Sequence, residues 1–393
     1  MIFANIFLNL QLISIKMYNF FYKKVWCLFL FCLVLFSCQS TEQNLSITAV
    51  EADVTSNAEL KLSEYFENFM MLKLPTDIVI GQIQRIIYEN NLIYISDGQT
   101  LFIFSDDGEM LSCFQKIGNG PGEYKNINDF MVDGEAITIL DRSQQRLLIY
   151  DHSGESISTH NLGYYAQAIS PTVNNSFFLY FDNAFSHKLR RVKNGQEDSM
   201  YLAVDNDRDK YLFIFSYHNF YKYQESIYFF QEMNDTIYKS VGGGSIKPSF
   251  YVDFKGRNIP ASFFKERYRN VIAFFDKLYT TSYAYGVLSF AIYDRFMMFG
   301  SSYRQDTKLT VFDLKNDISN TFASIKDDVY FKGLTIPVSE FIYHANNRIF
   351  VPLDAFSITE WRNAHPPSEQ FKEMVNATKE EDNPLLLIFD FKK

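Results

Sequence analysis

The glycine-rich segment Gly118–Tyr124, which reads GNGPGEY, is the first candidate for chemistry. Such loops bind phosphate when their backbone N–H groups converge at the start of a helix. This segment matches neither G-x-x-x-x-G-K-[ST] nor G-x-G-x-x-G opening a helix, and strand-like runs flank it. Pro121 also removes one N–H donor. We therefore predict a structural loop between two repeated units.

Metal-binding patterns are weak. Asp205–Asp209 (DNDRD) begins like a calcium loop, but Lys210 stands where glycine is required and Ser216 where a bidentate glutamate is required. A solvated acidic turn is the better interpretation. The six histidines form no i,i+4 pair and no H-E-x-x-H motif, so no zinc site is predicted. We expect neither a metal nor a cofactor.

No catalytic residue is predicted either. The sequence contains no G-x-S-x-G elbow for acyl transfer. Paired carboxylates for glycoside chemistry could still be assembled from distant segments. An enzyme, a lyase or hydrolase acting on polysaccharide or peptide, therefore remains an open alternative to a binding protein.

The elements that must position any site are short strands in a repeat. LIYISD, LFIF and a Gly108 turn precede the glycine-rich loop, and AITILD, LLIY and a Gly154 turn follow it. Asp97 and Asp141 are 44 residues apart, and Phe104 and Tyr150 are 46 apart. A repeat of short strands at this period is typical of propeller blades, which cannot bury their faces alone.

The same pattern continues to the C-terminus and predicts an all-β, six-bladed β-propeller with one or two short helical insertions. The motif of the third strand recurs as LFIFSDDG, LLIYDHSG, LTVFDLKN and LLIFDFK. The expected blades begin and end near residues 83–117, 127–163, 165–204, 211–254, 283–324 and 337–390.

The last repeat stops after its third strand. The apolar segment Phe69–Leu74 can supply the missing outer strand, so that N- and C-terminal strands close the ring and no sheet edge stays unpaired. Pro260–Tyr279 has apolar residues at helical spacing, and Pro366–Thr378 has a weaker form of the same pattern. We expect both to be packed helical insertions, although either could present a surface to a partner.

The N-terminus has the pattern of an export signal. Lys23 and Lys24 precede the apolar run Val25–Phe36, which is too short to span a bilayer. The run ends in LFSC, similar to a bacterial lipobox, which predicts lipidation of Cys38. The alternative is an ordinary secretory signal. We expect a signal peptide over residues 1–37, with Met17 as an alternative start, a flexible tether over 38–62 and the propeller over 63–393.

Composition limits the classes of partner. The formal net charge of −9 argues against nucleic acid, whose binding requires a cationic surface. Cys113 is the single cysteine after Cys38, so no disulfide can form within a mature chain, and we expect Cys113 to be a buried strand residue.

Three segments carry a resemblance to a known group: the Gly118–Tyr124 loop after Lys116-Ile117, the block Asn234–Tyr238 (NDTIY), and Asn383–Leu387 (NPLLL). With the lipobox, they resemble the six-bladed β-propeller lipoproteins of Bacteroidetes, which are distant relatives of NHL-repeat propellers. The resemblance implies an exported protein anchored to a membrane. With the predicted lipidation of Cys38, we expect attachment outside the cytoplasmic membrane, at the outer membrane. The resemblance implies no reaction, and it leaves a periplasmic or a surface-facing position open.

A ligand site is expected on one face of the ring. In propellers, the loops from an outer strand to the next inner strand gather around the central channel. Residues at these points form an aromatic and polar set suited to sugars or peptides. The candidates for ligand binding are Arg85, Tyr124, Asn128, Tyr165, Gln167, Tyr283, Tyr285 and Glu340.

Of these, Tyr124, Tyr165, Tyr285 and Glu340 are predicted to bound the channel mouth, and the insertion around Phe264–Leu278 is the next candidate. The predicted function is a non-catalytic binding or scaffolding module at the cell envelope, for a carbohydrate, a peptide or a protein partner.

Overall fold

The computed structural model describes residues 47–172, 176–181, 183, 185–211, 218–338, 343–345, 347–364 and 367–393. The predicted signal peptide, Cys38, Ser216 and Glu340 lie outside these residues. No helix in the described ranges is long and apolar enough to cross a bilayer.

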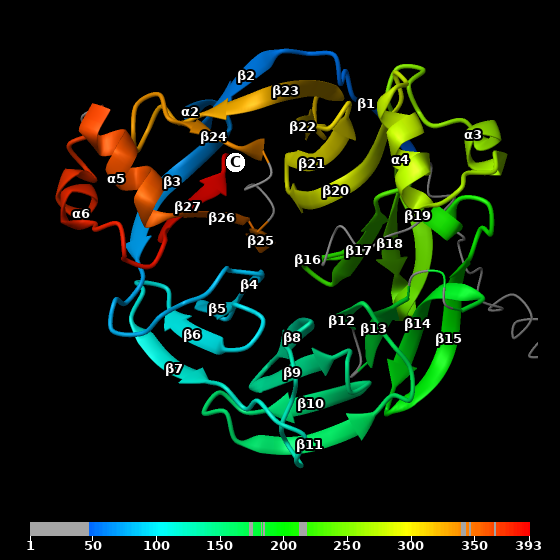
Figure 1. Cartoon of the computed structure of the whole chain (residues 1–393), viewed down its shortest axis with the longest axis horizontal. Coiled ribbons are helices and arrows are strands. Elements are labelled where there is room, and N and C mark those ends of the chain that lie inside the picture. Colours follow the sequence, from blue (N-terminus) through cyan, green and yellow to red (C-terminus); the bar gives the residue numbers. More distant parts are fainter. Residues whose placement is uncertain are drawn as a thin grey trace, which may run out of the picture. The chain divides into compact units, whose positions relative to one another are not determined.

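Six antiparallel sheets lie around a ring, which confirms the predicted six-bladed β-propeller (Figure 1). We number the blades I to VI in chain order. Blade I contains β4 (Arg85–Glu89), β5 (Leu92–Ser96), β6 (Leu101–Ser105) and β7 (Met110–Phe114); blade II contains β8 (Asp129–Asp133), β9 (Ala136–Asp141), β10 (Arg146–Tyr150) and β11 (Ser156–Asn161); blade III contains β12 (Ala168–Thr172), β13 (Ser176–Tyr180), β14 (His187–Lys193) and β15 (Gln196–Ala203).

The remaining blades use strands from both ends of the chain. Blade IV contains β16 (Phe220–Tyr223), β17 (Ser226–Gln231), β18 (Asn234–Val241), β19 (Ser245–Asp253) and β1 (Thr48–Glu51); blade V contains β20 (Ala284–Tyr293), β21 (Phe296–Tyr303), β22 (Asp306–Asp313), β23 (Ile318–Lys326), β2 (Ala58–Lys61) and the short β24 (Thr335–Ile336); blade VI contains β25 (Tyr343–Ala345), β26 (Arg348–Leu353), β27 (Leu385–Phe391) and β3 (Phe66–Lys73).

The recurring third-strand motif is explained by its position. These strands, β6, β10, β22 and β27, lie inside their sheets and are covered on both faces by neighbouring blades. Their sequences are therefore nearly continuous apolar runs rather than alternating ones. β27 shows this most completely, because all seven of its residues are buried.

The predicted closure of the ring is confirmed. β3 pairs antiparallel with β27, with Met71 opposite Leu387 and Leu72 opposite Leu386. β3, the first long strand, and β27, the last strand, therefore belong to one sheet. Because β27 pairs with β26 on one side and with β3 on the other, neither of its edges is left unpaired.

The segment expected to be a flexible tether is partly ordered. β1 pairs in parallel with β19, and β2 pairs in parallel with β23, so that both add a fifth strand to the outer edge of a blade. Val50 and Leu60 are fully buried in the same apolar cluster as the strands beneath them. The tether prediction is therefore corrected from Thr48 onward, because these short strands bury apolar residues that a tether would expose.

The helical insertions are present, with different boundaries from those expected. Pro260–Tyr279 forms two helices, α3 (Ala261–Lys265) and α4 (Val271–Tyr279), instead of one. Asn270 ends the break between them, because its side chain accepts a hydrogen bond from the N–H of Ala273 and caps α4.

In the C-terminal insertion, α6 (Lys372–Ala377) was expected, whereas α5 (Ala355–Ala364) was not. A single-turn helix, α2 (Leu62–Tyr65), precedes β3. Two 3₁₀ turns are also present: η1 (Asp209–Tyr211) follows β15, and η2 (Gly242–Gly244) lies between β18 and β19.

The Gly118–Tyr124 loop is a structural link between blades I and II, as predicted. The Glu123 carboxylate accepts a hydrogen bond from the N–H of Gly120, and the Tyr150 hydroxyl donates to the carbonyl of Gly122. Gly122 has φ +68°, and a Cβ there would lie 2.7 Å from the Ser156 hydroxyl. Glycine is therefore required for both backbone conformation and space.

Cys113 is exposed on the outer strand β7, so the expectation that it is buried is wrong. On β7 the buried residue is Phe114, because this outer strand is covered on one face only.

Candidate functional site

One face of the ring carries the loops that enter the inner strands and the turns between second and third strands. Because strands within each blade alternate in direction, these two kinds of connection must lie at the same end. We call it the entry face. It includes the starts of β4, β8, β12, β16 and β20, and the predicted ligand-binding residues that the structure describes lie at or before the starts of β4, β8, β12 and β20.

Arg85 pairs with a residue that the sequence analysis missed. Its Nε lies 3.2 Å from Oδ1 of Asp129, the first residue of β8, in an ion pair that lacks the alignment of a hydrogen bond. The other oxygen, Oδ2, accepts a hydrogen bond from the N–H of Ile169 on β12. Asp129 therefore connects the inner strands of blades I, II and III.

Burial is the main influence on the pKa of Asp129, a residue that is only 2% exposed. Desolvation raises the pKa of this carboxyl to about 6, against the opposing effects of the Arg85 charge and of the backbone hydrogen bonds. The contacts with Arg85 and Ile169 join three blades, while the N–H of Phe130 donates to Oδ1 within the same strand, so the arrangement is suited to a structural role.

Side chains cross the ring axis at both ends of the inner strands. On the entry face, Nε2 of His218 lies 2.6 Å from the carbonyl oxygen of Gln84. At the other end, Nζ of Lys222 lies 2.9 Å from a carboxylate oxygen of Glu89. These contacts join blade IV to blade I, which are opposite each other in a ring of six. The axis is therefore not an open tube at either level.

The residues predicted to bound a channel mouth lie in different environments. Tyr124 is fully buried between blades I and II, where its hydroxyl donates to the carbonyl of Gln99 at 2.9 Å. No face of its ring is open to a ligand. Tyr165 is 53% exposed, and Tyr285 is buried in a cluster with α3 and α4. The structure does not bring these three rings together.

The other candidates have structural contacts. The side chain of Asn128 accepts from the N–H of Arg142, and Gln167 is buried at the start of blade III. Tyr283 packs edge-on against Phe263 of α3, with ring centroids 5.7 Å apart. Of the seven predicted residues that the structure describes, Tyr285 is the one that also lines the pocket described next.

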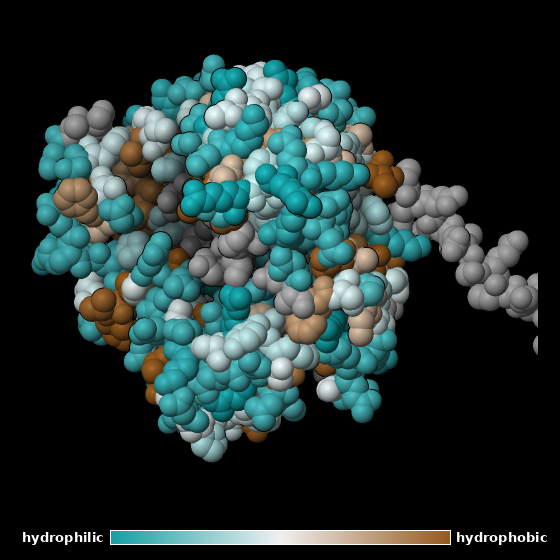
Figure 2. Space-filling view, turned by 45° about the vertical axis from the view of Figure 1, so that its right-hand side comes forward, coloured by the Kyte–Doolittle hydropathy of each residue, from teal (hydrophilic) through white to brown (hydrophobic). Residues whose placement is uncertain are grey.

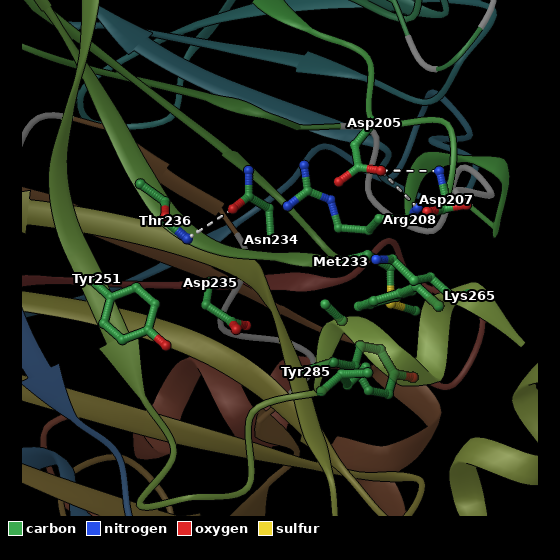
Figure 3. Close-up of a pocket in the computed structure, with 13 residues that line it drawn as sticks. Asp205, Asp207, Arg208, Met233, Asn234, Asp235, Thr236, Tyr251, Lys265 and Tyr285 are labelled. Carbon is green, nitrogen blue, oxygen red and sulfur yellow. Dashed lines mark hydrogen bonds between the residues drawn. The ribbon is translucent and has the colours of Figure 1, made fainter.

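A pocket of about 250 Å³ opens on the entry face beside blade IV (Figure 3). It is enclosed by the loop after β15, the turn between β17 and β18, and the insertion that contains α3. The residues that line it are Asp205, Asp207, Arg208, Met233, Asn234, Asp235, Thr236, Tyr251, Ile259, Ala261, Phe264, Lys265 and Tyr285.

A buried polar network holds the loop after β15 in place. The Asp209 carboxylate lies 2.7 Å from Nζ of Lys188, which is 1% exposed and also donates to Gln231. Desolvation lowers the pKa of Lys188, while the Asp209 charge acts in the opposite direction. Arg208 lies 3.2 Å from the same carboxylate. This wall of the pocket is therefore anchored to blades III and IV.

The DNDRD segment forms an acidic turn. Asp205 Oδ1 accepts hydrogen bonds from the N–H groups of Asp207 and Arg208, and the N–H of Asp205 donates to Asp209. No group of three or more potential metal ligands is present among the described residues. The Asp205 carboxylate therefore engages the backbone of its own turn, whereas the Asp209 carboxylate also pairs with Lys188 and Arg208.

Asp235 contributes a desolvated carboxylate to the pocket. It is the second residue of β18, and its Oδ2 accepts a hydrogen bond from Nδ2 of Asn258 at 2.8 Å. Burial raises the pKa of Asp235 to about 6, although the Asn258 hydrogen bond and the Arg208 charge lower it. Asp235 lies within the NDTIY block, so a sequence signal existed, but nothing in the sequence showed that this residue faces a cavity.

The rings of the pocket come from two walls. Tyr251 lies on β19 and is 40% exposed, whereas Phe264 and Tyr285 belong to the cluster that holds α3 and α4. Burial raises the pKa of Tyr285 above its ordinary value, so this phenol stays protonated and can donate a hydrogen bond. The pocket thus combines aromatic surface with charges of both signs.

Comparison with solved structures identifies the same fold in proteins of two Bacteroides species. A putative exported protein from Bacteroides fragilis has a TM-score of 0.68 at 19% identity, covering 88% of this chain and 100% of that one. A member of the DUF4221 family from Bacteroides vulgatus has a TM-score of 0.51 at 11% identity, covering 84% and 98%. At these identities the likeness shows the fold alone.

A virginiamycin B lyase from Staphylococcus aureus has a TM-score of 0.42 at 11% identity, covering 72% of this chain and 82% of that one. No curated protein matches the sequence. A family model described as a domain of unknown function, DUF4934, matches residues 45–390, which is the whole propeller. The chain therefore belongs to the DUF4934 family.

Proposed function

We propose that this chain is an exported binding module that holds a small polar ligand, a sugar unit or a short peptide segment, in the pocket beside blade IV. The observation that carries the proposal is the pocket itself, with its anchored walls and its combination of charged groups and rings. Its volume of about 250 Å³ is below the range of pockets for drug-sized ligands, so it fits one sugar ring or one side chain of a peptide.

The surface supports a small ligand better than a protein scaffold. On the side seen in Figure 2, hydrophobic residues form small separate groups within a mainly hydrophilic surface. Protein-binding surfaces usually carry a larger continuous apolar patch. The pocket, in contrast, offers burial together with directional polar groups.

The experiment begins with an array of oligosaccharides and short peptides, probed with the mature protein. The variant Tyr251→Ala/Lys265→Ala then removes one ring and one charge from residues that are at least partly exposed, so the fold should be preserved. Each group contributes on the order of 1 kcal/mol, so affinity should fall by roughly ten- to thirtyfold.

Tyr165→Ala is the matched control, because it removes an exposed tyrosine of blade III that does not line the pocket. It should leave affinity unchanged. If Tyr165→Ala weakens binding and the pocket variant does not, the ligand binds elsewhere on the entry face and the pocket proposal is wrong.

An enzyme is the second candidate, and one observation favours it. A carboxyl with a pKa near 6 in a pocket, as at Asp235, is suited to a general acid. A polysaccharide or peptide found on the array should then be cleaved at a rate that depends on Asp235. Recovery of the intact ligand after prolonged incubation would exclude this candidate for that ligand.

We also propose that the protein is attached to the outer membrane through lipid on Cys38, on the basis of the LFSC motif after an apolar run. Bacterial lipoproteins carry more than one acyl chain, which is what stable anchoring requires. A Cys38→Ala variant should move from the membrane fraction to the soluble fraction. Unchanged membrane attachment of this variant would contradict the proposal.

A further inference from the structure

The three carboxylates of the pocket differ in their hydrogen-bond partners and in their exposure to solvent. Asp205 is bound by two backbone N–H groups of its own turn, and Asp207 is a solvated residue whose side chain is 51% exposed. Asp235 is more deeply buried, and its carboxylate accepts a hydrogen bond from the neutral amide of Asn258. Among the described residues, no cation forms an ion pair with Asp235 within 4 Å.

Asn258 cannot easily turn away from Asp235. Its Nδ2 also donates to the carbonyl of Val252 at 2.8 Å, and its Oδ1 accepts from the N–H of Phe254 at 2.9 Å. The amide is therefore fixed at both ends and holds the Asp235 carboxylate in one orientation. In Figure 3, this carboxylate lies in the space between the rings of Tyr251 and Tyr285.

The cations of the pocket lie elsewhere. Arg208 is held at 3.2 Å from the Asp209 carboxylate, and Lys265 is an exposed residue at the end of α3. A ligand with a carboxylate or phosphate near Asp235 would meet a like charge in a poorly solvated place, which is costly. A cationic group would instead form the direct ion pair that the described residues do not give this carboxylate, whose nearest positive influence is the more distant Arg208 charge.

We infer that the pocket binds the protonated amino group of a small ligand, with the Asp235 carboxylate as its counter-charge and the rings of Tyr251 and Tyr285 beside it. This inference rests on the proposed function and specifies the ligand's chemistry. A carboxylate together with aromatic faces is a combination that recognises ammonium groups. The volume limits the bound part to a single amino sugar or a single amino-acid residue.

The test uses two pairs of probes that differ only in whether the amine is free or acetylated. The pairs are glucosamine with N-acetylglucosamine, and glycylglycine with N-acetylglycylglycine. Binding to the mature protein is measured by calorimetry or ligand-observed NMR at pH 7. In at least one pair, the free amine should bind at least tenfold more tightly than its acetylated form, and the pair that does so identifies a sugar or a peptide source.

Asp235→Asn keeps the shape of the side chain and removes its charge. It should abolish the preference for the free amine. Asp207→Asn is the matched control, because it removes the same charge from the same pocket at a solvated position, and it should retain the preference. Circular dichroism and thermal melting establish that both variants are folded.

Three results would overturn the inference: equal binding of free and acetylated probes, no binding of either, or an unchanged preference in Asp235→Asn. Equal binding that the Tyr251→Ala/Lys265→Ala variant abolishes would leave the proposed function intact while rejecting the ammonium site. The two ideas therefore fail on different observations.

The pH dependence provides a separate readout. The charged or titratable groups around Asp235 are Arg208, Asp205 and Asp207 of the loop after β15, Asp253 and Tyr251 of β19, Lys265 of α3 and Tyr285 of β20. Asp235 loses its charge as the pH falls through about 6, whereas Asp205 has a lowered pKa and stays ionised.

Affinity for the free amine should therefore be about tenfold weaker at pH 5 than at pH 7. The reason is that pH 5 lies one unit below the Asp235 pKa of about 6, so only about a tenth of this carboxyl is ionised there. Affinity should also fall above about pH 8 for glycylglycine, where a terminal amine loses its proton. The loss on the acidic side should be absent in Asp235→Asn. A wild-type affinity that is constant between pH 5 and pH 7 would contradict the assignment to Asp235.

Discussion

At the scale of single residues, the Asp129 side chain joins three blades on the entry face. It pairs with Arg85 of blade I and accepts an N–H from Ile169 of blade III, while its own strand begins blade II. Replacing one partner of a buried ion pair leaves the other charge without compensation. The contribution of Asp129 is therefore to stability, in contrast to that of Asp235.

Asp129→Ala should lower the free energy of unfolding by about 3 kcal/mol, because it leaves the Arg85 guanidinium and the Ile169 N–H without their acceptor. Asp133→Ala is the matched control, since Asp133 ends the same strand and is exposed. Urea denaturation measures both. A loss below about 1 kcal/mol for Asp129→Ala would show that the pair does not stabilise the ring.

The pH dependence of stability follows from the same residue. The pKa of Asp129 in the folded state, about 6, is above the value of about 4 for an unfolded chain, so the folded state binds this proton more tightly. The free energy of unfolding therefore falls as the pH rises from about 4 to 6. The advantage of the wild type over Asp129→Asn should be larger at pH 4 than at pH 7, as denaturation at the two pH values would reveal; the opposite order would contradict this pKa.

At the scale of elements, the added strands β1 and β2 make the ring asymmetric. They cover the outer edges of blades IV and V in parallel, whereas blades I, II and III end in four-stranded sheets. Each added strand has a single buried residue, Val50 or Leu60. The hydrogen bonds of the pairing and these apolar contacts together hold the segment that precedes the ring.

Leu60→Ala should cost about 2–5 kcal/mol, the usual range for a leucine removed from a packed core. Glu59→Ala, at the neighbouring exposed position, should change stability by less than about 0.5 kcal/mol. Thermal and urea unfolding provide the comparison. Equal stability of the two variants would mean that β2 contributes nothing to the fold.

At the scale of the whole molecule, the ring depends on one strand that connects its two ends. β27 lies between β26 and β3, and its seven buried residues include six aliphatic or aromatic side chains with no exposure or almost none. Each such side chain contributes roughly 1.5–3 kcal/mol on burial. Their sum is comparable to the entire stability of a domain, about 5–15 kcal/mol.

A chain that ends at Asn383 should therefore fail to unfold cooperatively, because removing β27 opens blade VI on both sides. A chain that lacks only the exposed Lys393 should behave as the wild type. Circular dichroism during heating distinguishes the two. A cooperative transition at the wild-type temperature in the shorter chain would show that closure through β27 is not required.

The sequence by itself determined the blades and their closure. Repeats such as LFIF and LLIF can be recognised as buried strands from their local sequence. A strand buried on both faces must be apolar along its whole length, wherever the rest of the chain lies. The pairing of Phe69–Leu74 with the last strand followed from counting strands. β1 and β2 were not predicted, since a four-residue strand with a single buried position has no detectable periodicity.

The site was decided by the tertiary structure. Tyr124 and Tyr285 both lie close to the start of an inner strand, yet one is enclosed between blades I and II and the other lines a pocket. Asp235, Asp205 and Lys265 come from three separate connections that only the ring geometry brings to one place. Side-chain burial and the pKa of Asp235 depend on these neighbours, so no local pattern could encode them.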